Sequence, residues 1–378
     1  MEAKRIEEAL EAAVGKVRRN AGRFGTSFPP DASTNLDYSP GLGENVGWTT
    51  GFWLGLLWLT YQVTGWDDLR DLARALGPTF DRRLRAGVGI DHDLGMLFMP
   101  SRALEYRLTG DRAAREAALE AASALAARFR EPGGYIQAWG APDDPAEAGR
   151  TIIDSMMNIP LLFWAYRETG TDAFHEKAIR HARTVGRYLV RGDGSSYHTF
   201  FFDPASGQPV GGRTHQGHSD GSTWARGQAW GLYGFTLAHR LSGDPRFLDH
   251  ARRLAEYFLA HLPDDGVCYW DLDLSGPGQP RDTSAAALAV CGLLELARCT
   301  AGADGARYQT AARAIADQLV AGYQAPPEKE GLLAEAVADL PRGRGVREST
   351  LYGDYFYLEA LVRLGGKDVM LPWLSNQL

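Results

Sequence analysis

Two aspartates stand in sequence surroundings that suit acid–base chemistry. Asp154 lies in GRTIIDSMMNIPLLFW with apolar residues on both sides, and Asp93 follows Asp91 and His92 in GIDHDLGMLFMPS. Apolar surroundings disfavour a charged carboxylate and raise its pKa, which prepares an aspartate to donate a proton. Paired carboxyl groups are also typical of enzymes that hydrolyse carbohydrates. Each aspartate would equally suit the N-cap of a helix, and the flanking residues alone leave both interpretations open.

A long segment between residues 195 and 231 is a candidate ligand-binding loop. It reads SSYHTFFFDPASGQPVGGRTHQGHSDGSTWARGQAWG and holds His198, His215 and His218. A plain connection between helices has little use for so many histidines, glycines and tryptophans, so the segment indicates a binding function. A metal site is not expected, because no HxH or HxxxH spacing stands on a helix and Asp220 is the one acid beside the later histidines.

Three tryptophans and one arginine complete the set of candidate binding residues. Trp139 in YIQAWG, Trp224 and Trp230 have flat apolar faces on which sugar rings can stack, although any one of them could equally be a core aromatic. Arg226 can hold a carboxylate through its two-pronged guanidinium, or pair instead with a structural acid. These residue types fit a sugar ligand that carries a carboxylate.

The elements that must position these residues are helical hairpins. One phrase recurs along the chain: an apolar helix, a small residue and glycine, then a second helix rich in Ala, Leu and Arg. Glycine can take the left-handed conformation that ends a helix, and the Asp or Thr after it can cap the next one. The glycines of the five clear copies and of a fading sixth copy in YLEALVRLGGKDVML are Gly65, Gly110, Gly170, Gly243, Gly302 and Gly365.

Six such hairpins predict an all-α fold, an (α/α)6 barrel or six-hairpin toroid, formed by residues 1–378 as a single domain. The first helix of each pair is apolar nearly all round, whereas the second alternates apolar and charged residues, as expected for an inner ring of helices inside an outer ring. The irregular spacing of the glycines argues against an open solenoid. An unclosed helical bundle is the alternative.

The candidate residues fall at one level of this predicted barrel. Each glycine marks one end of an inner helix, so residues about 11 to 20 positions earlier mark the other end. Helix N-termini that converge on one rim favour an anionic ligand, and we expect the site there. Counting back in this way gives Trp48, Asp93, Asp154, Arg226, Asp282 and Asp354.

The overall composition argues against several other classes of function. The net charge is −7 without a broad basic surface, so binding to nucleic acid is not expected. The most apolar run, Phe52 to Leu59, is too short to cross a bilayer, and the charged N-terminal segment lacks the apolar core of a signal peptide. Cys268, Cys291 and Cys299 lack CxxC spacing, which indicates reduced thiols. We expect a cytoplasmic protein without membrane contact, either a monomer or a weak homo-oligomer.

Eight phrases of the sequence, spread from about residue 45 to residue 365, together carry a family resemblance. They are NVGWTTGFWLGLLWL, DHDLGM, GGYIQAWG, IIDSMMNIPLL, RGDGSSYHTFFFD, THQGHSDGSTWARGQAWGLYGF, DTSAAALAVCGLLELA and LYGDYFYLEALVRL. The set resembles the unsaturated glucuronyl hydrolases of glycoside hydrolase family 88, and THQG with DGSTWARGQAWG is its most specific part. The unsaturated rhamnogalacturonyl hydrolases of family 105 share the fold and chemistry but are less similar in that part, and they are the near alternative.

The resemblance implies a glycosidase for unsaturated oligosaccharides that polysaccharide lyases release, of the glycosaminoglycan type. Such an enzyme hydrates the C4=C5 bond of a 4-deoxy-4,5-unsaturated uronic acid at the non-reducing end, which releases the sugar. Asp154 of the IID motif would protonate C4 and activate water, and Asp93 of the HD pair would be the second essential carboxylate. No metal or other cofactor is implied. The residues that match the family's substrate-binding positions are Trp48, His92, Trp139, His198, Gln216, Arg226 and Trp230.

Other functions of the same barrel stay open. Inverting glucanases and polysaccharide lyases use such toroids on saturated glycans, and a non-catalytic sugar-binding module would need the aromatic residues but not Asp154. The loop DLPRGRGVREST concentrates Arg342, Arg344 and Arg347. It could bind a sulfate or a carboxylate of the aglycone, or be an ordinary solvated surface.

Overall fold

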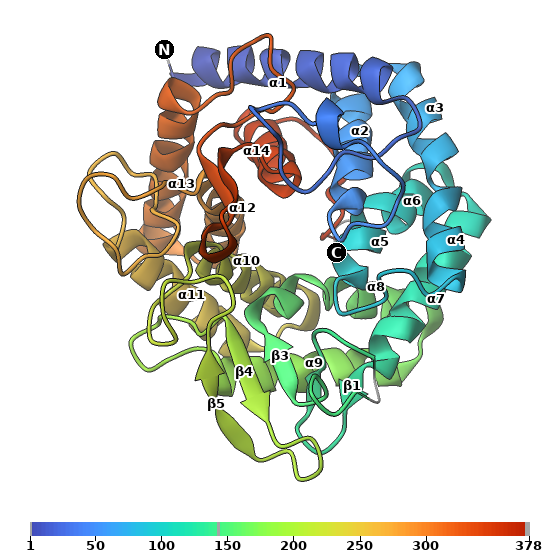
Figure 1. The fold of residues 1–378 in the computed structure, drawn as a ribbon, viewed down its shortest axis with the longest axis vertical. Helices are drawn as coiled ribbons and strands as arrows, with labels where there is room; N and C mark the ends of the chain where they lie inside the picture. The colour runs from blue at the N-terminus through green and yellow to red at the C-terminus, as the bar shows by residue number, and fades with distance from the viewer. Residues whose placement is uncertain (1, 142–143, 375–378) are drawn as a thin grey trace.

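The computed structural model describes residues 2–141 and 144–374, and its helices form two concentric rings (Figure 1). The inner ring consists of α2 (Thr50–Thr64), the interrupted helix formed by α5 (Leu94–Phe98), η2 (Met99–Ala103) and α6 (Leu104–Thr109), then α8 (Pro160–Thr169), α10 (Ala225–Ser242), α12 (Thr283–Cys299) and α14 (Leu351–Leu364). The outer ring consists of α1 (Glu2–Phe24), α3 (Asp67–Leu76) with α4 (Pro78–Arg85), α7 (Arg112–Ala127), α9 (Asp172–Tyr188), α11 (Pro245–Ala260) and α13 (Gly302–Gly322). Outer and inner helices alternate along the chain, so the predicted (α/α)6 barrel is confirmed.

A cluster of buried apolar side chains joins the two rings. It runs from Ile6 in α1 to Trp373 near the end of the described chain. The inner helix α12 is buried along residues 283–296, whereas the outer helix α11 buries a stripe that includes Phe247 and Phe258. This difference matches the predicted contrast between apolar inner helices and amphipathic outer ones. Between residues 2–141 and 144–374, no helix is both long and apolar enough to cross a membrane.

Four predicted turns between inner and outer helices are confirmed. Gly65, Gly110, Gly170 and Gly243 each follow an inner helix, with φ of 71°, 74°, 69° and 75°. These values lie in the left-handed region that glycine reaches without a steric penalty. In each case the outer helix begins two residues later, so one turn geometry is used four times.

The ring closes differently from the sequence prediction. A sixth outer helix is expected after Gly365, but residues 365–374 form none, and α1 takes that place instead. α1 packs against α2, α13 and α14, and its buried face includes Leu10 and Val14. Gly365 has φ of −76°, and the left-handed residue is Gly366. The fading sixth repeat is therefore half of a hairpin, whose partner helix stands at the other end of the chain.

Short strands, absent from the all-α prediction, lie in the connections that lead from outer to inner helices. In the described part of the chain they form three antiparallel sheets, β1 (Phe129–Arg130) with β2 (Tyr135–Ile136), β3 (Arg150–Ile152) with β4 (Thr199–Phe202) and β5 (Pro209–Arg213), and β6 (Ala336–Asp339) with β7 (Arg344–Glu348). Because these connections run in the same direction across the barrel, the sheets stand at one end of it. That end is the rim on which the site is predicted.

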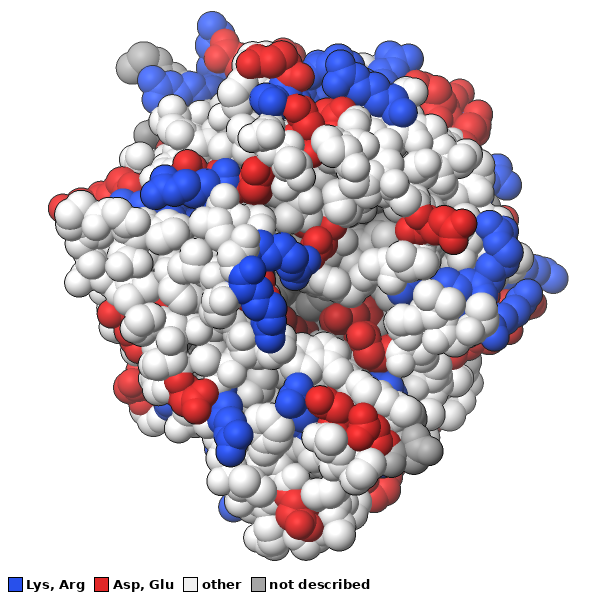
Figure 2. All heavy atoms as spheres, viewed as in Figure 1, with Lys and Arg blue, Asp and Glu red and all other residues white. Residues whose placement is uncertain are grey.

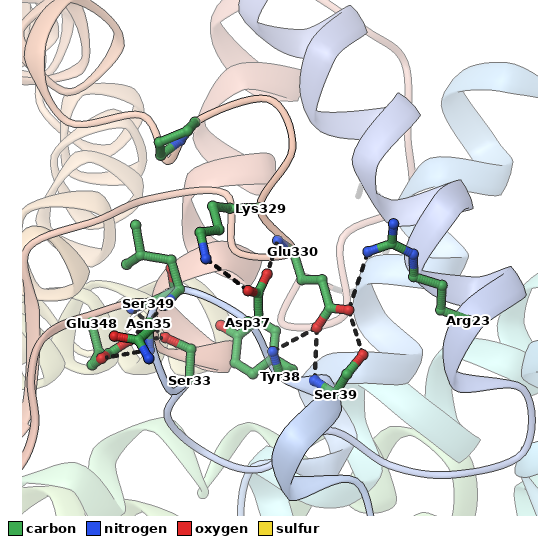
Figure 3. A network of polar contacts seen from close by, with 12 residues as sticks. Arg23, Ser33, Asn35, Asp37, Tyr38, Ser39, Lys329, Glu330, Glu348 and Ser349 are labelled. Atoms are coloured by element: carbon green, nitrogen blue, oxygen red, sulfur yellow. Dashed lines mark hydrogen bonds and ion pairs between the residues drawn. The ribbon is translucent and has the colours of Figure 1, made fainter.

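The connection before α2, which carries Trp48, is held by carboxylates from the far end of the chain, as Figure 3 shows. Glu330 accepts hydrogen bonds from the backbone N–H groups of Tyr38 and Ser39, at 2.6 and 2.7 Å, and forms an ion pair with Arg23. A buried carboxylate with this many partners fixes the path of the connection.

A second carboxylate stabilises an unusual turn in the same connection. Asn35 and Leu36 have φ of 52° and 63°, a region that residues with a side chain rarely adopt. Glu348, the last residue of β7, accepts hydrogen bonds from both of their N–H groups, at 2.9 and 2.8 Å. The strained turn is thus held by the sheet at the rim of the barrel.

Replacing Glu330 with Ala should lower the free energy of unfolding by about 3 kcal/mol, because two backbone amides and Arg23 lose a buried acceptor. Urea or thermal unfolding measures the loss. Glu328→Ala is the matched control, since Glu328 is exposed two residues earlier and its removal should cost less than about 0.5 kcal/mol. Equal losses in the two variants would contradict this view of the connection.

Candidate active site

Asp154 and Asp93 lie deep in the barrel at the start of neighbouring inner helices. Asp154 is part of the short helix η3 (Ile153–Met157) that leads into α8, and Asp93 directly precedes α5. The two residues are 9% and 7% exposed, and neither side chain forms a capping hydrogen bond. Asp93 stands at the N-cap position of α5 and Asp154 lies inside η3, but neither carboxylate serves as a helix cap. Figure 2 shows a hollow at the centre of this face, with acidic side chains inside it and basic side chains on its edge.

His198 defines the surroundings of Asp154. Its Nε2 lies 4.0 Å from Asp154 Oδ1, and its Nδ1 accepts hydrogen bonds of 3.2 Å from the backbone N–H groups of His215 and Gln216. Nδ1 is therefore unprotonated, and the proton of the neutral ring is on Nε2, which faces Asp154. Burial lowers the pKa of His198 well below its usual value, and the charge of His215 adds to this effect. A neutral imidazole thus stands beside Asp154 rather than a cation.

The carboxyl group of Asp154 keeps its proton near neutral pH. Its pKa is raised from 3.8 to about 8, mainly by burial and then by the charge of Asp93, while Arg226 opposes the shift. Within the described residues, Oδ1 is buried without a hydrogen-bond partner. A protonated carboxyl group in this state can donate its proton to a molecule that enters the pocket.

Asp93 has surroundings that favour its charged form more than those of Asp154. Burial raises its pKa to about 7, but a hydrogen bond from Asn158 and the charges of Arg128 and Arg83 oppose the shift. Asn158 Nδ2 lies 3.3 Å from Asp93 Oδ1, and His92 Nε2 lies 3.5 Å from the same oxygen. Asp93 therefore ionises before Asp154 as the pH rises, which gives the pair one acid and one anion.

Arg226 is buried and already paired. One Nη donates to Asp282 at 2.9 Å, and the guanidinium also donates to two backbone carbonyls of β6, at 2.5 and 2.7 Å. It lies 4.4 Å from the ring centre of Trp224 and 4.9 Å from that of Tyr352. Asp282 is therefore the structural acid that was expected as an alternative partner of Arg226. These bonds use three of the five N–H donors of the guanidinium, so two donors are left for other contacts. Its charge still reaches Asp154.

Two of the predicted rim acids have structural roles. Asp282 caps α12 by accepting hydrogen bonds from the N–H groups of Ser284 and Ala285, and it also pairs with Arg226. Asp354 accepts hydrogen bonds from the Tyr38 hydroxyl, at 2.9 Å, and from two backbone amides at 3.0 Å. Their carboxylates hold the rim together and are not free for a ligand.

The predicted aromatic residues differ in their burial. Trp48 is half-buried and stacks on Tyr352, with ring centres 5.2 Å apart. Trp139 is also half-buried and lies against His92 and His215, at 6.2 and 4.9 Å.

Trp230, in contrast, is fully buried and packs against Phe356 and Tyr352. Trp230 is therefore a core aromatic, which is the alternative that the sequence left open. Trp224 is 3% exposed and lies 4.2 Å from the ring of His198, so it supports that histidine. Gln216 is half-buried, and its side-chain amide donates to a carbonyl of β6 at 2.7 Å.

Sequence reasoning missed two residues that shape the pocket. Tyr352 stacks on Trp48 and on Arg226, and Asn158 contacts both His92 and Asp93. Asn158 stands four residues after Asp154 in IIDSMMNIP, where an amide inside an apolar run was a usable signal. Tyr352 carried no comparable signal, because tyrosines are common in the core of such a barrel.

The arginine-rich loop is the β6–β7 hairpin. Arg342 pairs with Asp339 at 2.6 Å, and its second Nη lies 3.3 Å from His215 Nδ1. Arg344 and Arg347 each form an ion pair with an acid of their own. Arg342 is the arginine of this group that touches a residue of the candidate site, and all three are about half exposed.

Comparison with known proteins decides between the families that this geometry suits. The model of Glycosyl Hydrolase Family 88 matches residues 25–355. The chain belongs to glycoside hydrolase family 88. The resemblance seen in the sequence is confirmed, and this family 88 protein is a glycosidase.

Family 88 relatives match nearly the whole chain. The unsaturated glucuronyl hydrolase of Bacillus sp. (strain GL1) is 43% identical over 364 residues, which cover 95% of this chain and 96% of the relative. The crystal structure of the enzyme from Bacillus sp. GL1 superposes with a TM-score of 0.92 at 42% identity, over 95% of this chain and 96% of the other. The unsaturated chondroitin disaccharide hydrolase of Streptococcus agalactiae is 41% identical, over 97% of this chain and 93% of the relative.

Stability against pH tests whether this family 88 protein keeps Asp154 protonated. Between the ordinary pKa of 3.8 and the folded value of about 8, the native state holds a proton that the unfolded chain has lost, so stability from this residue falls as the pH rises. The Asp154→Asn variant has no titratable group at this position, so this pH dependence is absent from it. The linkage amounts to about 1.4 kcal/mol for each pH unit between the two pKa values, so the variant should gain on the order of 5 kcal/mol relative to the parent between pH 4 and pH 8.

The control for that experiment has the opposite sign. The pKa of Asp244 lies well below its usual value, because its carboxylate accepts hydrogen bonds from Arg246. Its contribution to stability is therefore present at neutral pH and lost in acid. Asp244→Asn should be less stable than the parent at pH 8. A difference between Asp154→Asn and the parent that does not change with pH would contradict the assignment.

Proposed function

We propose that this glycosidase acts on the unsaturated oligosaccharides that polysaccharide lyases release from glycosaminoglycans. Its substrate carries a 4-deoxy-4,5-unsaturated uronic acid at the non-reducing end, and addition of water across C4=C5 releases that sugar. The observation that carries the proposal is Asp154, a buried carboxyl group whose raised pKa leaves it protonated at neutral pH beside a second carboxyl group. The names of the Bacillus and Streptococcus relatives support the substrate class.

Protonation of carbon is the first step. The C4=C5 bond is part of an enol ether, so C4 is electron-rich and accepts a proton from a neutral acid. Asp154 donates that proton, and positive charge develops at C5 and on the ring oxygen. The Asp93 carboxylate stabilises this charge, because it lies in a buried site where electrostatic interactions are weakly screened.

Addition of water completes the cycle. Asp154, now a carboxylate, takes a proton from water as its oxygen bonds to C5, which restores the acid and gives a hemiketal. The hemiketal opens by breaking the bond between C5 and the ring oxygen, and C1 then carries both a hydroxyl group and the aglycone. Collapse to the aldehyde expels the aglycone as an alcohol. One water is consumed, and no group attacks C1.

The remaining predicted residues are assigned to substrate binding. Trp48 and Trp139 are half-buried and can offer ring faces to a sugar, and Arg226 supplies positive charge toward the uronate carboxylate. His198 holds its Nε2 proton toward the same pocket. The proposed set is Trp48, His92, Trp139, His198, Gln216 and Arg226, whereas Trp230 is fully buried behind them and supports the pocket from the core.

The aglycone and the compartment belong to the same proposal. Arg342 contacts His215 and is half-exposed, so it is the basic residue placed to meet an acidic aglycone such as a sulfated hexosamine. Cytoplasmic residence fits the free cysteines Cys268, Cys291 and Cys299, because a reducing compartment preserves thiols.

Loss of the ultraviolet absorbance of the conjugated alkene tests the reaction. The parent should bleach unsaturated chondroitin or heparin disaccharides, and Asp154→Asn should lower kcat by about 10²–10⁴-fold with little change in binding, because it lacks the proton donor. Unsaturated rhamnogalacturonan disaccharides are tested in parallel, because a preference for them would indicate the substrate class of family 105 instead. If Asp154→Asn bleaches the substrate at the parental rate, Asp154 is not the proton donor. If the parent binds the disaccharides tightly but does not bleach them, the protein is a binding module.

The pH dependence of kcat/KM tests the division of roles. Asp93 must be ionised, so activity should fall as the pH drops below about 7, and Asp154 must be protonated, so it should fall again above about 8. The expected profile is a narrow bell with both limbs close to neutral pH. Asp154→Glu should keep a bell of lower height. A parental profile that stays flat from pH 5 to pH 10 would contradict the two roles.

A further inference from the structure

Asn158 is the amide that joins the two catalytic segments. It is fully buried between η3, which carries Asp154, and α8. Its Oδ1 accepts a hydrogen bond of 2.7 Å from the backbone N–H of Met96 in α5, and its Nδ2 lies 3.3 Å from Asp93 Oδ1 and 3.4 Å from His92 Nδ1. The Asn158 side chain therefore makes three polar contacts with the segment that carries Asp93.

The orientation of this amide follows from its partners. The Met96 N–H is a donor, so the atom that faces it must be the oxygen, and the NH2 group must face Asp93 and His92. The two hydrogens of the NH2 group then serve Asp93 Oδ1 and His92 Nδ1. Because His92 Nδ1 accepts, its ring proton is on Nε2, which lies 3.5 Å from Asp93 Oδ1.

A close backbone approach fixes Asn158 in this position. A Cβ at Gly95 would lie 2.3 Å from both Cα and O of Asn158, far inside van der Waals contact. Only a glycine allows α5 to rest directly on the segment that follows Asp154. The amide is thus held by the backbone on one side and by Met96 on the other.

We propose that Asn158 is a positioning residue that keeps Asp93 anionic and, through Asp93, leaves the catalytic proton on Asp154. The inference rests on the proposed function, in which these carboxyl groups are anion and acid. Asp93 Oδ1 accepts a hydrogen bond from the amide of Asn158, and this bond favours the charged form of the carboxylate. The Nε2–H of His92, in the tautomer that Asn158 selects, lies 3.5 Å from the same oxygen without forming a hydrogen bond.

Several other charged groups also face Asp93, so the effect of Asn158 has to be separated from theirs. Asp91 and His92 come from the segment before α5, Arg83 from α4, Arg128 from the end of α7, and Asp154 from η3. Within the described residues, the side-chain hydrogen bond to Asp93 comes from Asn158. A substitution of Asn158 changes this bond and leaves each of those charges in place.

Asn158→Asp is the sharpest variant, because it keeps the size of the side chain and replaces the donor with an oxygen. The acid limb of the kcat/KM profile should move to higher pH by at least about one unit, since a hydrogen bond to a carboxylate has been lost. At pH 7 kcat should fall by about fivefold or more, because a one-unit rise from a pKa of about 7 lowers the ionised fraction of Asp93 from about one half to about one tenth, with KM changed by less than about threefold. Asn158→Ala removes the amide without adding a charge and should move the limb in the same direction.

Asn20→Asp is the matched control. Asn20 is a buried amide on α1 that donates to the carbonyl of Glu330 at 2.7 Å, far along the chain from the catalytic segments. The substitution should lower thermal stability and leave the acid limb where the parent has it. If both variants of Asn158 are destabilised but keep the parental limb, Asn158 is merely structural and the inference is overturned.

Carbon-13 labelling of the aspartate carboxyl groups separates failure of this inference from failure of the proposed function. The titration of Asp93 is followed in the parent and in Asn158→Ala, with Asp93→Asn used to assign its signal, and no turnover is needed. A higher pKa of Asp93 in Asn158→Ala supports the inference even if the parent leaves every unsaturated disaccharide intact. An unchanged pKa overturns it even if the parent is fully active.

Discussion

Two buried carboxyl groups stand within electrostatic reach of each other, and the free-energy cost of charging both of them shapes the rest of the site. Burial raises the pKa of Asp93 and of Asp154, and the charge of the first raises that of the second further. At neutral pH the pair therefore favours one negative charge and one retained proton. Protonation of an alkene carbon requires this combination, because the acid supplies the proton and the anion stabilises the positive charge that follows.

The barrel brings these groups together through close backbone contacts at its rim. Gly95 allows the start of α5 to lie against the segment after η3, where any Cβ would overlap the backbone. On the other side, β3 pairs with β4, and the N–H of Ile153 donates to the carbonyl of His198 at 3.0 Å. The neighbours of Asp154 are thus placed by the backbone. Such placement keeps the desolvated acid in register with its partners at a small entropic cost.

The sequence predicts the framework better than the contacts inside it. The left-handed glycines, such as Gly65 and Gly243, mark their turns by residue type, since glycine reaches that conformation without the steric cost that a Cβ imposes. The closure by α1 could not be seen, because it joins helices from opposite ends of the chain. The strands were missed because each has only two to five residues and is defined by its partner.

The same limit applies to the candidate site. Apolar flanks marked Asp154, because desolvation by local residues is visible in a sequence. The pairing of Arg226 with Asp282 and the contact of Asn158 with Asp93 depend on tertiary geometry. A run of residues can therefore indicate that a carboxyl group is buried, but not which groups will bond to it.

The histidine beside Asp154 shows why those tertiary contacts matter for the chemistry. A protonated imidazole at this distance would favour the Asp154 carboxylate and lower its pKa, which would remove the acid. The loop prevents this, because two backbone amides donate to His198 Nδ1 and would clash with a proton there. Asp271 holds the same loop by accepting from the N–H of His218 at 2.8 Å and from the hydroxyl of Ser222 at 2.7 Å. The length of this segment thus has a physical use: it turns its own backbone N–H groups toward a histidine so that the neighbouring acid keeps its proton.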